Sequence, residues 1–139
     1  MKEPGRERAE GATQVTRGRQ QVLAVLVTLG GSIVVVALLG GSPLPAMIVQ
    51  LVVLALLGYQ TMRGVGWARW VLVALTGLAA LGNGYAGLES YGADGIGWIV
   101  NASLAAIYLW CAAVLVLSEA VVAFQAAARA RGAAPPPAP

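Results

Sequence analysis

Four long apolar stretches, separated by short turns, constrain this chain more than any other feature of its sequence. They cover residues 21–40, 44–62, 67–88 and 96–118. Each is close to the roughly 20 helical residues that are needed to cross the hydrocarbon core of a bilayer. Because the connections between them are short, neighbouring helices must run antiparallel. The sequence therefore predicts an all-α membrane protein, built as an antiparallel up-down-up-down four-helix transmembrane bundle.

Charge is scarce in the chain and unevenly distributed along it. Of the 139 residues, 58% are hydrophobic and only 11% are charged, whereas a soluble domain carries roughly a quarter charged residues. The basic residues lie in the tails and short loops, a distribution that indicates membrane orientation. We therefore expect the lipid bilayer as the surroundings of this protein and no nucleic-acid partner.

The segments that flank the apolar region are expected to have no core of their own. Residues 1–20 are polar, mixed in charge and interrupted by Pro and Gly, which predicts a disordered N-terminal tail. The transmembrane domain is assigned to residues 21–128, with the fourth helix continuing beyond its span as a cytoplasmic helical extension. Residues 129–139 are rich in Ala and Pro and are predicted to form a disordered C-terminal tail.

All nine Lys and Arg residues fall on one side of the predicted bundle. Besides those of the N-terminal tail, they are Arg63 and Arg69 near the second turn, and Arg129 and Arg131 near the C-terminus. Cytoplasmic loops of membrane proteins are enriched in Lys and Arg. The chain is therefore predicted to be a multi-pass protein of the cell inner membrane, with its N- and C-termini in the cytoplasm.

Tryptophans flank the predicted spans, where they are typical of membrane interfaces. Trp67 and Trp70 follow the second turn, and Trp98 begins the fourth span. We expect the first two at the inner interface and the third at the outer one. Together with Arg63 and Arg69, these tryptophans are the predicted topology anchors.

A short motif opens the third apolar stretch. Residues 64–69 read GVGWAR, which has the pattern Gly-x-x-Trp-Ala-Arg. A turn with this pattern recurs between helices two and three of many small bacterial four-span inner-membrane proteins of unassigned function. The chain resembles these proteins in its length, its number of spans and this turn. The resemblance implies the same architecture and adds no activity.

Residue types that carry enzymatic chemistry are rare in this sequence. It has no His and a single cysteine, Cys111, which excludes imidazole metal sites and paired-cysteine chemistry. Glu119 is the one acid within an apolar run, and its position predicts that it lies at the cytoplasmic interface. No nucleophile–base pair can be assembled from the spans. We therefore expect no enzyme, no metal site and no cofactor.

Polar residues in the spans define a candidate polar pocket. Gln50, Asn83 and Asn101 each lie about five residues from the outer end of a predicted span, roughly 8 Å deep at 1.5 Å per residue. Tyr108 follows Asn101 by seven residues, on nearly the same helical face. The alternative interpretation is that these groups only hydrogen-bond between packed helices.

Two classes of function agree with these features. The favoured one is a non-enzymatic accessory or interaction subunit that binds another membrane protein or itself. It rests on the lack of catalytic groups and on helix faces made of small residues. The alternative is a small transporter or ligand-binding module that uses the outer-leaflet polar cluster. This alternative predicts that Gln50, Asn83 and Asn101 converge.

Overall fold

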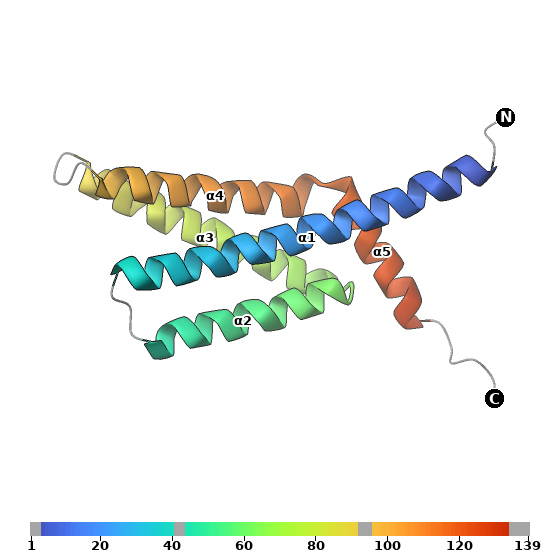
Figure 1. Cartoon of the computed structure of the whole chain (residues 1–139), viewed down its shortest axis with the longest axis horizontal. Coiled ribbons are helices and arrows are strands. Elements are labelled where there is room, and N and C mark those ends of the chain that lie inside the picture. Colours follow the sequence, from blue (N-terminus) through green and yellow to red (C-terminus); the bar gives the residue numbers. More distant parts are fainter. Residues whose placement is uncertain (1–3, 41–43, 92–95, 134–139) are drawn as a thin grey trace.

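The predicted antiparallel four-helix bundle is confirmed by a computed structural model, which describes residues 4–40, 44–91 and 96–133. Four of its helices are long and apolar enough to cross a membrane. These four alternate in direction along the bundle (Figure 1). The elements are α1 (Pro4–Gly40), α2 (Leu44–Met62), α3 (Gly66–Ser90), α4 (Gly97–Leu117) and α5 (Glu119–Ala133).

The boundaries of the apolar stretches agree closely with the observed helices. The stretch 44–62 coincides with α2, and the stretches 67–88 and 96–118 differ from α3 and α4 by one or two residues at each end. The stretch 21–40 is the second part of α1. The agreement has a physical reason: every backbone polar group in lipid needs an internal partner, so an apolar run of this length must be helical.

The prediction of a disordered N-terminal tail over residues 1–20 is wrong for the part of it that the structure describes. Helix α1 is continuous from Pro4 to Gly40, so the apolar span is preceded by a long helical extension. The extension crosses α5 (Figure 1). Burial against α5 supplies the stabilising contacts that the polar segment cannot make alone. Each further residue of an anchored helix also adds a backbone hydrogen bond.

A second correction concerns the end of the fourth helix, which does not continue straight beyond its span. Helix α4 ends at Leu117, and Ser118 has an extended backbone with φ −77° and ψ 112°. The backbone N–H of Val121 donates to Ser118 Oγ at 3.4 Å, and Ser118 Oγ donates to Gln21 Oε1 at 2.5 Å. Ser118 therefore caps a new helix, α5, as serine commonly does at helix starts.

Helix α5 also overturns part of the predicted C-terminal tail. It extends to Ala133, so the prediction of disorder over 129–139 is wrong for residues 129–133. Residues 134–139 lie outside the described part of the chain. Glu119 lies in the first turn of α5, and Arg131 lies in its last turn. The helix dipole favours a negative charge at the start of a helix and a positive charge at its end.

The core consists of two clusters of buried side chains from different helices. The larger cluster contains residues of α1, α2, α3 and α4, among them Leu72, Tyr108, Cys111 and Leu115. The smaller cluster joins α1 to α5. Helix α2 contributes little to either cluster, since its buried residues are Leu57, Gly58 and Thr61, all in its second half. The first half of α2 is therefore not closed against the rest of the bundle.

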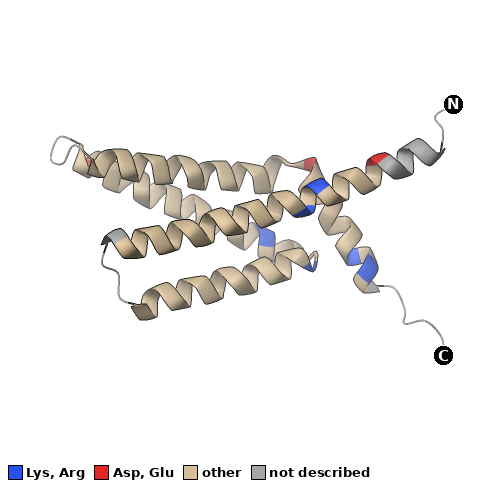
Figure 2. Ribbon diagram, viewed as in Figure 1, with Lys and Arg blue, Asp and Glu red and all other residues tan. Residues whose placement is uncertain are grey.

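The two ends of the bundle differ in charge, and we name them accordingly. The basic end is where the extension of α1, the α2–α3 turn and α5 meet, and Figure 2 shows the described Lys and Arg residues gathered there. The far end is where α1 and α3 finish and α2 and α4 begin (Figure 1). Within the described residues, the far half of the bundle carries no basic side chain.

Candidate functional site

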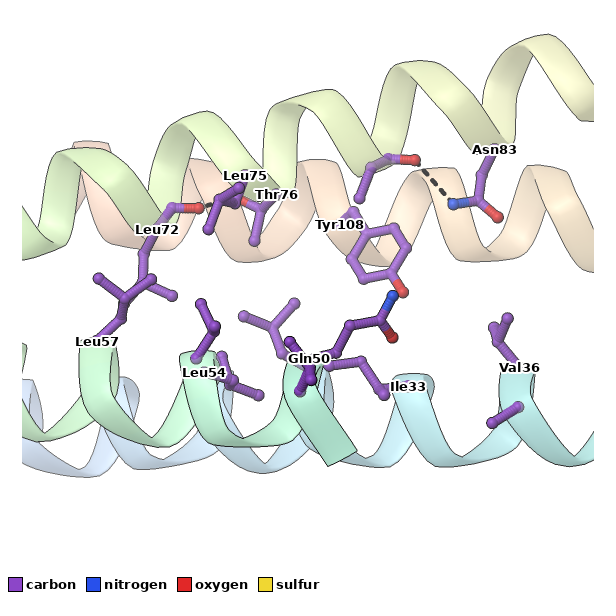
Figure 3. A pocket seen from close by; sticks show the side chains of 15 residues that line it. Ile33, Val36, Gln50, Leu54, Leu57, Leu72, Leu75, Thr76, Asn83 and Tyr108 are labelled. Atoms are coloured by element: carbon purple, nitrogen blue, oxygen red, sulfur yellow. Dashed lines mark hydrogen bonds between the residues drawn. The ribbon is translucent and has the colours of Figure 1, made fainter. Parts of the chain in front are cut away.

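A cavity of about 460 Å³ lies between α1, α2 and α3, in the part of the bundle that α2 leaves open. It extends from Leu57 and Leu72 toward Asn83 at the far end, with Tyr108 from α4 reaching into it (Figure 3). Its volume lies within the range of roughly 300–1,000 Å³ that is typical of small-molecule sites. The bundle therefore contains a space of ligand size within the membrane-spanning region.

The lining of the cavity is mainly aliphatic, with four polar side chains among its fifteen residues. These are Gln50, Thr76, Asn83 and Tyr108. Three of them, Gln50, Asn83 and Tyr108, are residues that the sequence predicted for a polar pocket. Thr76 adds to them because it precedes Asn83 by seven residues and therefore lies on the same face of α3.

The polar groups of α3 are partly satisfied by their own helix. Thr76 Oγ1 donates to Leu72 O at 2.8 Å, and Asn83 Nδ2 donates to Ala79 O at 2.7 Å. Short polar side chains often make such bonds to the preceding turn of a helix. Asn83 still has its carboxamide oxygen and its second N–H, which the helix does not use.

Tyr108 is held in place across the bundle by a hydroxyl from α1. Ser32 Oγ donates to Tyr108 Oη at 3.0 Å and also lies 2.8 Å from Leu29 O. Both side chains are buried, with exposed fractions of 8%. A hydrogen bond between two buried hydroxyls on different helices restricts the ring of Tyr108 to one orientation. The phenol thereby becomes a preorganised polar group at the cavity.

Gln50 is the polar lining residue with the most hydrogen-bonding capacity left. Its carboxamide points from α2 toward the ring of Tyr108 in Figure 3. It makes no hydrogen bond with any residue in the described part of the chain. A free carboxamide offers two N–H donors and one acceptor oxygen. Gln50 can therefore recognise either a carbonyl or a hydroxyl group.

Asn101 lies outside this cavity, so its predicted convergence with Gln50 and Asn83 is wrong. Its Nδ2 donates to Gly97 O in its own helix at 3.0 Å. Its Cβ faces α3, where a Cβ built on Gly87 would come within 3.4 Å of it. The sequence estimate gave Asn101 and Asn83 the same depth, but Asn101 lies opposite Gly87, four residues beyond Asn83 along α3. The α3–α4 contact directs its side chain to a different neighbour.

The predicted topology anchors lie at the two ends of the bundle. Trp67 and Trp70 are exposed at the basic end, where Arg69 stacks on the Trp70 ring at 5.5 Å and Arg63 stacks on Tyr59. At the far end, the Trp98 ring meets Tyr91 edge-on, with centroids 5.6 Å apart. Their role as interfacial anchors stays a prediction.

Sequence reasoning assigned Arg69 to anchoring alone and gave Gln125 no role. The structure joins them: Arg69 Nη1 donates to Gln125 Oε1 at 3.4 Å, and Gln125 is only 1% exposed. The missing signal was the serine–glutamate pair at residues 118–119, which is typical of a helix start. This pair indicates a separate helix after the fourth span, but it does not indicate the direction of that helix.

The fold and the cavity define the class of this molecule as a small four-span helical membrane protein with a space between three of its helices. Comparisons with protein-family models, with curated proteins and with solved structures found no match. The resemblance carried by residues 64–69 therefore stays a prediction.

Proposed function

We propose that this protein binds a lipid-soluble molecule with an uncharged polar head, and that the cavity between α1, α2 and α3 is the binding site. One observation carries this proposal. Side chains from three helices, Gln50, Asn83 and Tyr108, line one mainly aliphatic cavity of about 460 Å³. Apolar walls with a few convergent polar groups are the usual make-up of a small-molecule site.

The lining restricts the chemistry of the ligand. No charged residue is among the described residues that line the cavity, and an unpaired charge in such surroundings is strongly disfavoured. The free carboxamide of Gln50 and the hydroxyl of Tyr108 favour a carbonyl or hydroxyl on the ligand. The aliphatic remainder favours a hydrocarbon chain or ring beside that polar head.

Access to the cavity is proposed to come from the bilayer. Several lining residues of α2 and α3 are themselves exposed, among them Val49 at 61%, Val53 at 42% and Leu75 at 44%. Because these residues belong to membrane-spanning helices, their exposed surface faces lipid. A molecule dissolved in the bilayer therefore reaches Gln50 without passing through water.

The proposed activity is binding without catalysis, in the inner membrane, with both termini in the cytoplasm. The lining offers amide and hydroxyl groups but no nucleophile beside a base. The orientation is supported by the one-sided distribution of Lys and Arg. A reporter fused after Pro139 is expected to report the cytoplasm, and a reporter active only on the other side of the membrane would reverse the orientation.

Blocking the cavity tests the proposal directly. Ala79 lines the cavity, whereas Ala74 is exposed on another face of the same helix. The probe is a long-chain alcohol that carries a photoreactive diazirine, applied to membranes that contain the full chain. Ala79→Phe is expected to reduce labelling of the cavity residues about 10-fold, the equivalent of 1.4 kcal/mol, while Ala74→Phe leaves it unchanged. Equal labelling of both variants and the wild type would refute the site.

The polar head is tested by changing one lining group. Gln50→Leu keeps the approximate size of the side chain and removes its donors and acceptor. A lost hydrogen bond of about 1 kcal/mol predicts roughly five-fold weaker capture of the alcohol. A diazirine hydrocarbon without the hydroxyl serves as the control, and its labelling should not change. If both probes respond alike, the cavity is occupied by acyl chains without recognition of a head group.

The second candidate function is an accessory or interaction subunit that binds another membrane protein or a second copy of this chain. It is supported by Gly77 and Gly84 of α3, since a Cβ at either position would meet nothing within 4 Å. Two small residues on one face allow another helix to approach closely. Crosslinking in native membranes tests this function: Gly77→Leu should abolish a crosslinked product, and Gly82→Leu on another face should not. A chain that crosslinks neither to itself nor to another membrane protein would exclude it.

A further inference from the structure

Two buried donor atoms at the basic end have no acceptor within the described part of the chain. They are Arg69 Nε and Gln125 Nε2. Gln125 is 1% exposed, and its carboxamide oxygen already accepts from Arg69. Buried polar groups are nearly always hydrogen-bonded, so a pair of unsatisfied donors side by side requires an explanation.

These donors belong to a place where α5 meets the start of α3, which we call the α3–α5 junction: Arg69, Gln125 and Arg129 with the turn Gly64–Gly66. Arg129 Nε donates to Gly64 O at 2.7 Å. Gly64 has φ +83°, and a Cβ there would lie 2.8 Å from Gln125 O. The left-handed turn thereby fits closely against α5, with Arg129 bonded to the turn and Arg69 bonded to the side chain of Gln125.

The α3–α5 junction is electropositive. Neither Arg69 nor Arg129 pairs with a carboxylate among the described residues. The start of α3 adds to this, because its N-cap residue Val65 makes no side-chain capping bond. The first N–H groups of a helix and its dipole both favour a negative charge. The nearest acid on α5, Glu119, is exposed and more than one helical turn before Gln125.

We propose that the α3–α5 junction binds a phosphate oxyanion, carried by a lipid headgroup or free in solution. All of the side-chain groups available at the junction donate hydrogen bonds, and phosphate accepts several at once. Arg129 is exposed and Arg69 is partly exposed, so both side chains can be approached from the headgroup region, whereas the atoms Arg69 Nε and Gln125 Nε2 are themselves buried. Figure 2 shows the junction at the end where the basic residues gather, the position at which anionic lipids are attracted.

The competing explanation is that Arg69 and Gln125 only join α3 to α5. The variant Gln125→Glu separates the two roles. A carboxylate at this position pairs with Arg69 inside the protein, which preserves or strengthens the contact between the helices. The same carboxylate repels a phosphate. A purely structural role therefore predicts that Gln125→Glu responds to anions as the wild type does, whereas phosphate binding predicts that its response to anions is much weaker.

The experiment measures the melting temperature of the full chain in a neutral detergent, with phosphatidylglycerol, phosphatidylcholine or inorganic phosphate added. The wild type is expected to be stabilised by phosphatidylglycerol and not by the zwitterionic phosphatidylcholine. If inorganic phosphate stabilises it equally at the same concentration, the anion is free phosphate. If only phosphatidylglycerol acts, the anion is a lipid headgroup. No stabilisation by either anion would overturn the proposal.

Matched variants show whether the stabilisation by anions comes from the junction or from the general positive charge of this end. Arg129→Gln and Gln125→Glu are each expected to weaken the anion response about 10-fold, as for the loss of a charge-assisted hydrogen bond. Arg131→Gln is the control, because Arg131 is exposed and its Nε bonds only to Ala127 O of its own helix. It should change the response less than about two-fold. Equal losses for Arg131→Gln and Arg129→Gln would mean diffuse attraction without a site.

Discussion

The basic end and the far half of this bundle are packed in opposite ways. At the basic end, Val22, Val121 and Phe124 are almost fully buried between α1 and α5, and so are the polar Thr61 and Gln125. In the far half, the first part of α2 buries no residue, and the cavity opens beside it. The same chain thus closes one end tightly and leaves the other open to the bilayer.

The difference follows from the residues available at each contact. Lipid tails are as apolar as leucine side chains, so helices in a membrane associate only where they fit closely or exchange polar contacts. At the basic end, Gly18 meets α5, Gly64 meets α5, and Gly58 meets Leu26 of α1. The first part of α2 instead presents bulky residues such as Ile48 and Val53. At the basic end small residues thus allow close contacts, whereas the bulky first part of α2 leaves room for a ligand.

The largest effect is expected at the crossing of α1 and α5. A Cβ at Gly18 would collide with the backbone of Ala120 and the Cβ of Phe124, neither of which can rotate away. Gly18→Ala is therefore expected to lower the free energy of unfolding by about 3 kcal/mol, as severe overpacking does. Thermal unfolding in detergent measures it. The control is Gly11→Ala, which meets nothing within 4 Å and should be neutral or stabilising by up to about 1 kcal/mol. If the two variants are equally stable, the basic end is not packed as tightly as we describe, and its contrast with the far half disappears.

The α2–α3 turn is expected to be the next most sensitive position. Gly64→Ala places a side chain at φ +83° and 2.8 Å from Gln125 O. The left-handed conformation alone costs about 1–2 kcal/mol for a residue with a Cβ, and loss of the contact with α5 adds to it. At Gly66 the nearest atom is the flexible end of Arg129 at 3.4 Å. Gly66→Ala should therefore unfold at nearly the wild-type temperature, and a comparable loss in both variants would contradict this account.

A smaller effect is expected in the far half, at the hydrogen bond between α1 and α4. Tyr108→Phe removes the partner of Ser32. Hydrogen bonds between membrane helices average about 0.6 kcal/mol and reach about 1.7 kcal/mol, so the melting temperature should fall only slightly. Tyr85→Phe, on a side chain that is 65% exposed, is the matched control and should have no effect. A loss as large as that of Gly18→Ala would show that the far half is as tightly coupled as the basic end.

The smallest effect on stability is expected at the cavity itself. Gln50 is exposed and makes no hydrogen bond within the described residues. Gln50→Leu is therefore expected to change the free energy of unfolding by less than about 0.5 kcal/mol, as is usual for a substitution away from packed contacts. Unfolding measured without added ligand checks this value. Marked destabilisation would assign Gln50 to packing and count against the ligand site.

The candidate cavity was predictable from the sequence in part. Gln50 and Asn83 lie at one depth on neighbouring spans, and both line the cavity. Asn101 has the same depth by residue number, yet it packs against Gly87, four residues beyond Asn83. Depth along a helix follows from the residue number and the rise per residue. The direction of a side chain around the bundle depends on which helix lies opposite, and the sequence of one helix does not contain that information.

The sequence by itself determined the four spans and the gathering of basic residues at one end, because both are local properties. Apolar runs of spanning length must be helical in lipid. The residue number then fixes the end of the bundle at which each basic residue lies, as for Arg63, Arg69, Arg129 and Arg131. The tertiary structure decided which faces are covered. It brought Gly18 to α5, Gln125 to Arg69, and Tyr108 to the cavity beside α2. Such contacts join residues far apart in the chain, and in a bilayer they depend on close fit, which no single segment specifies.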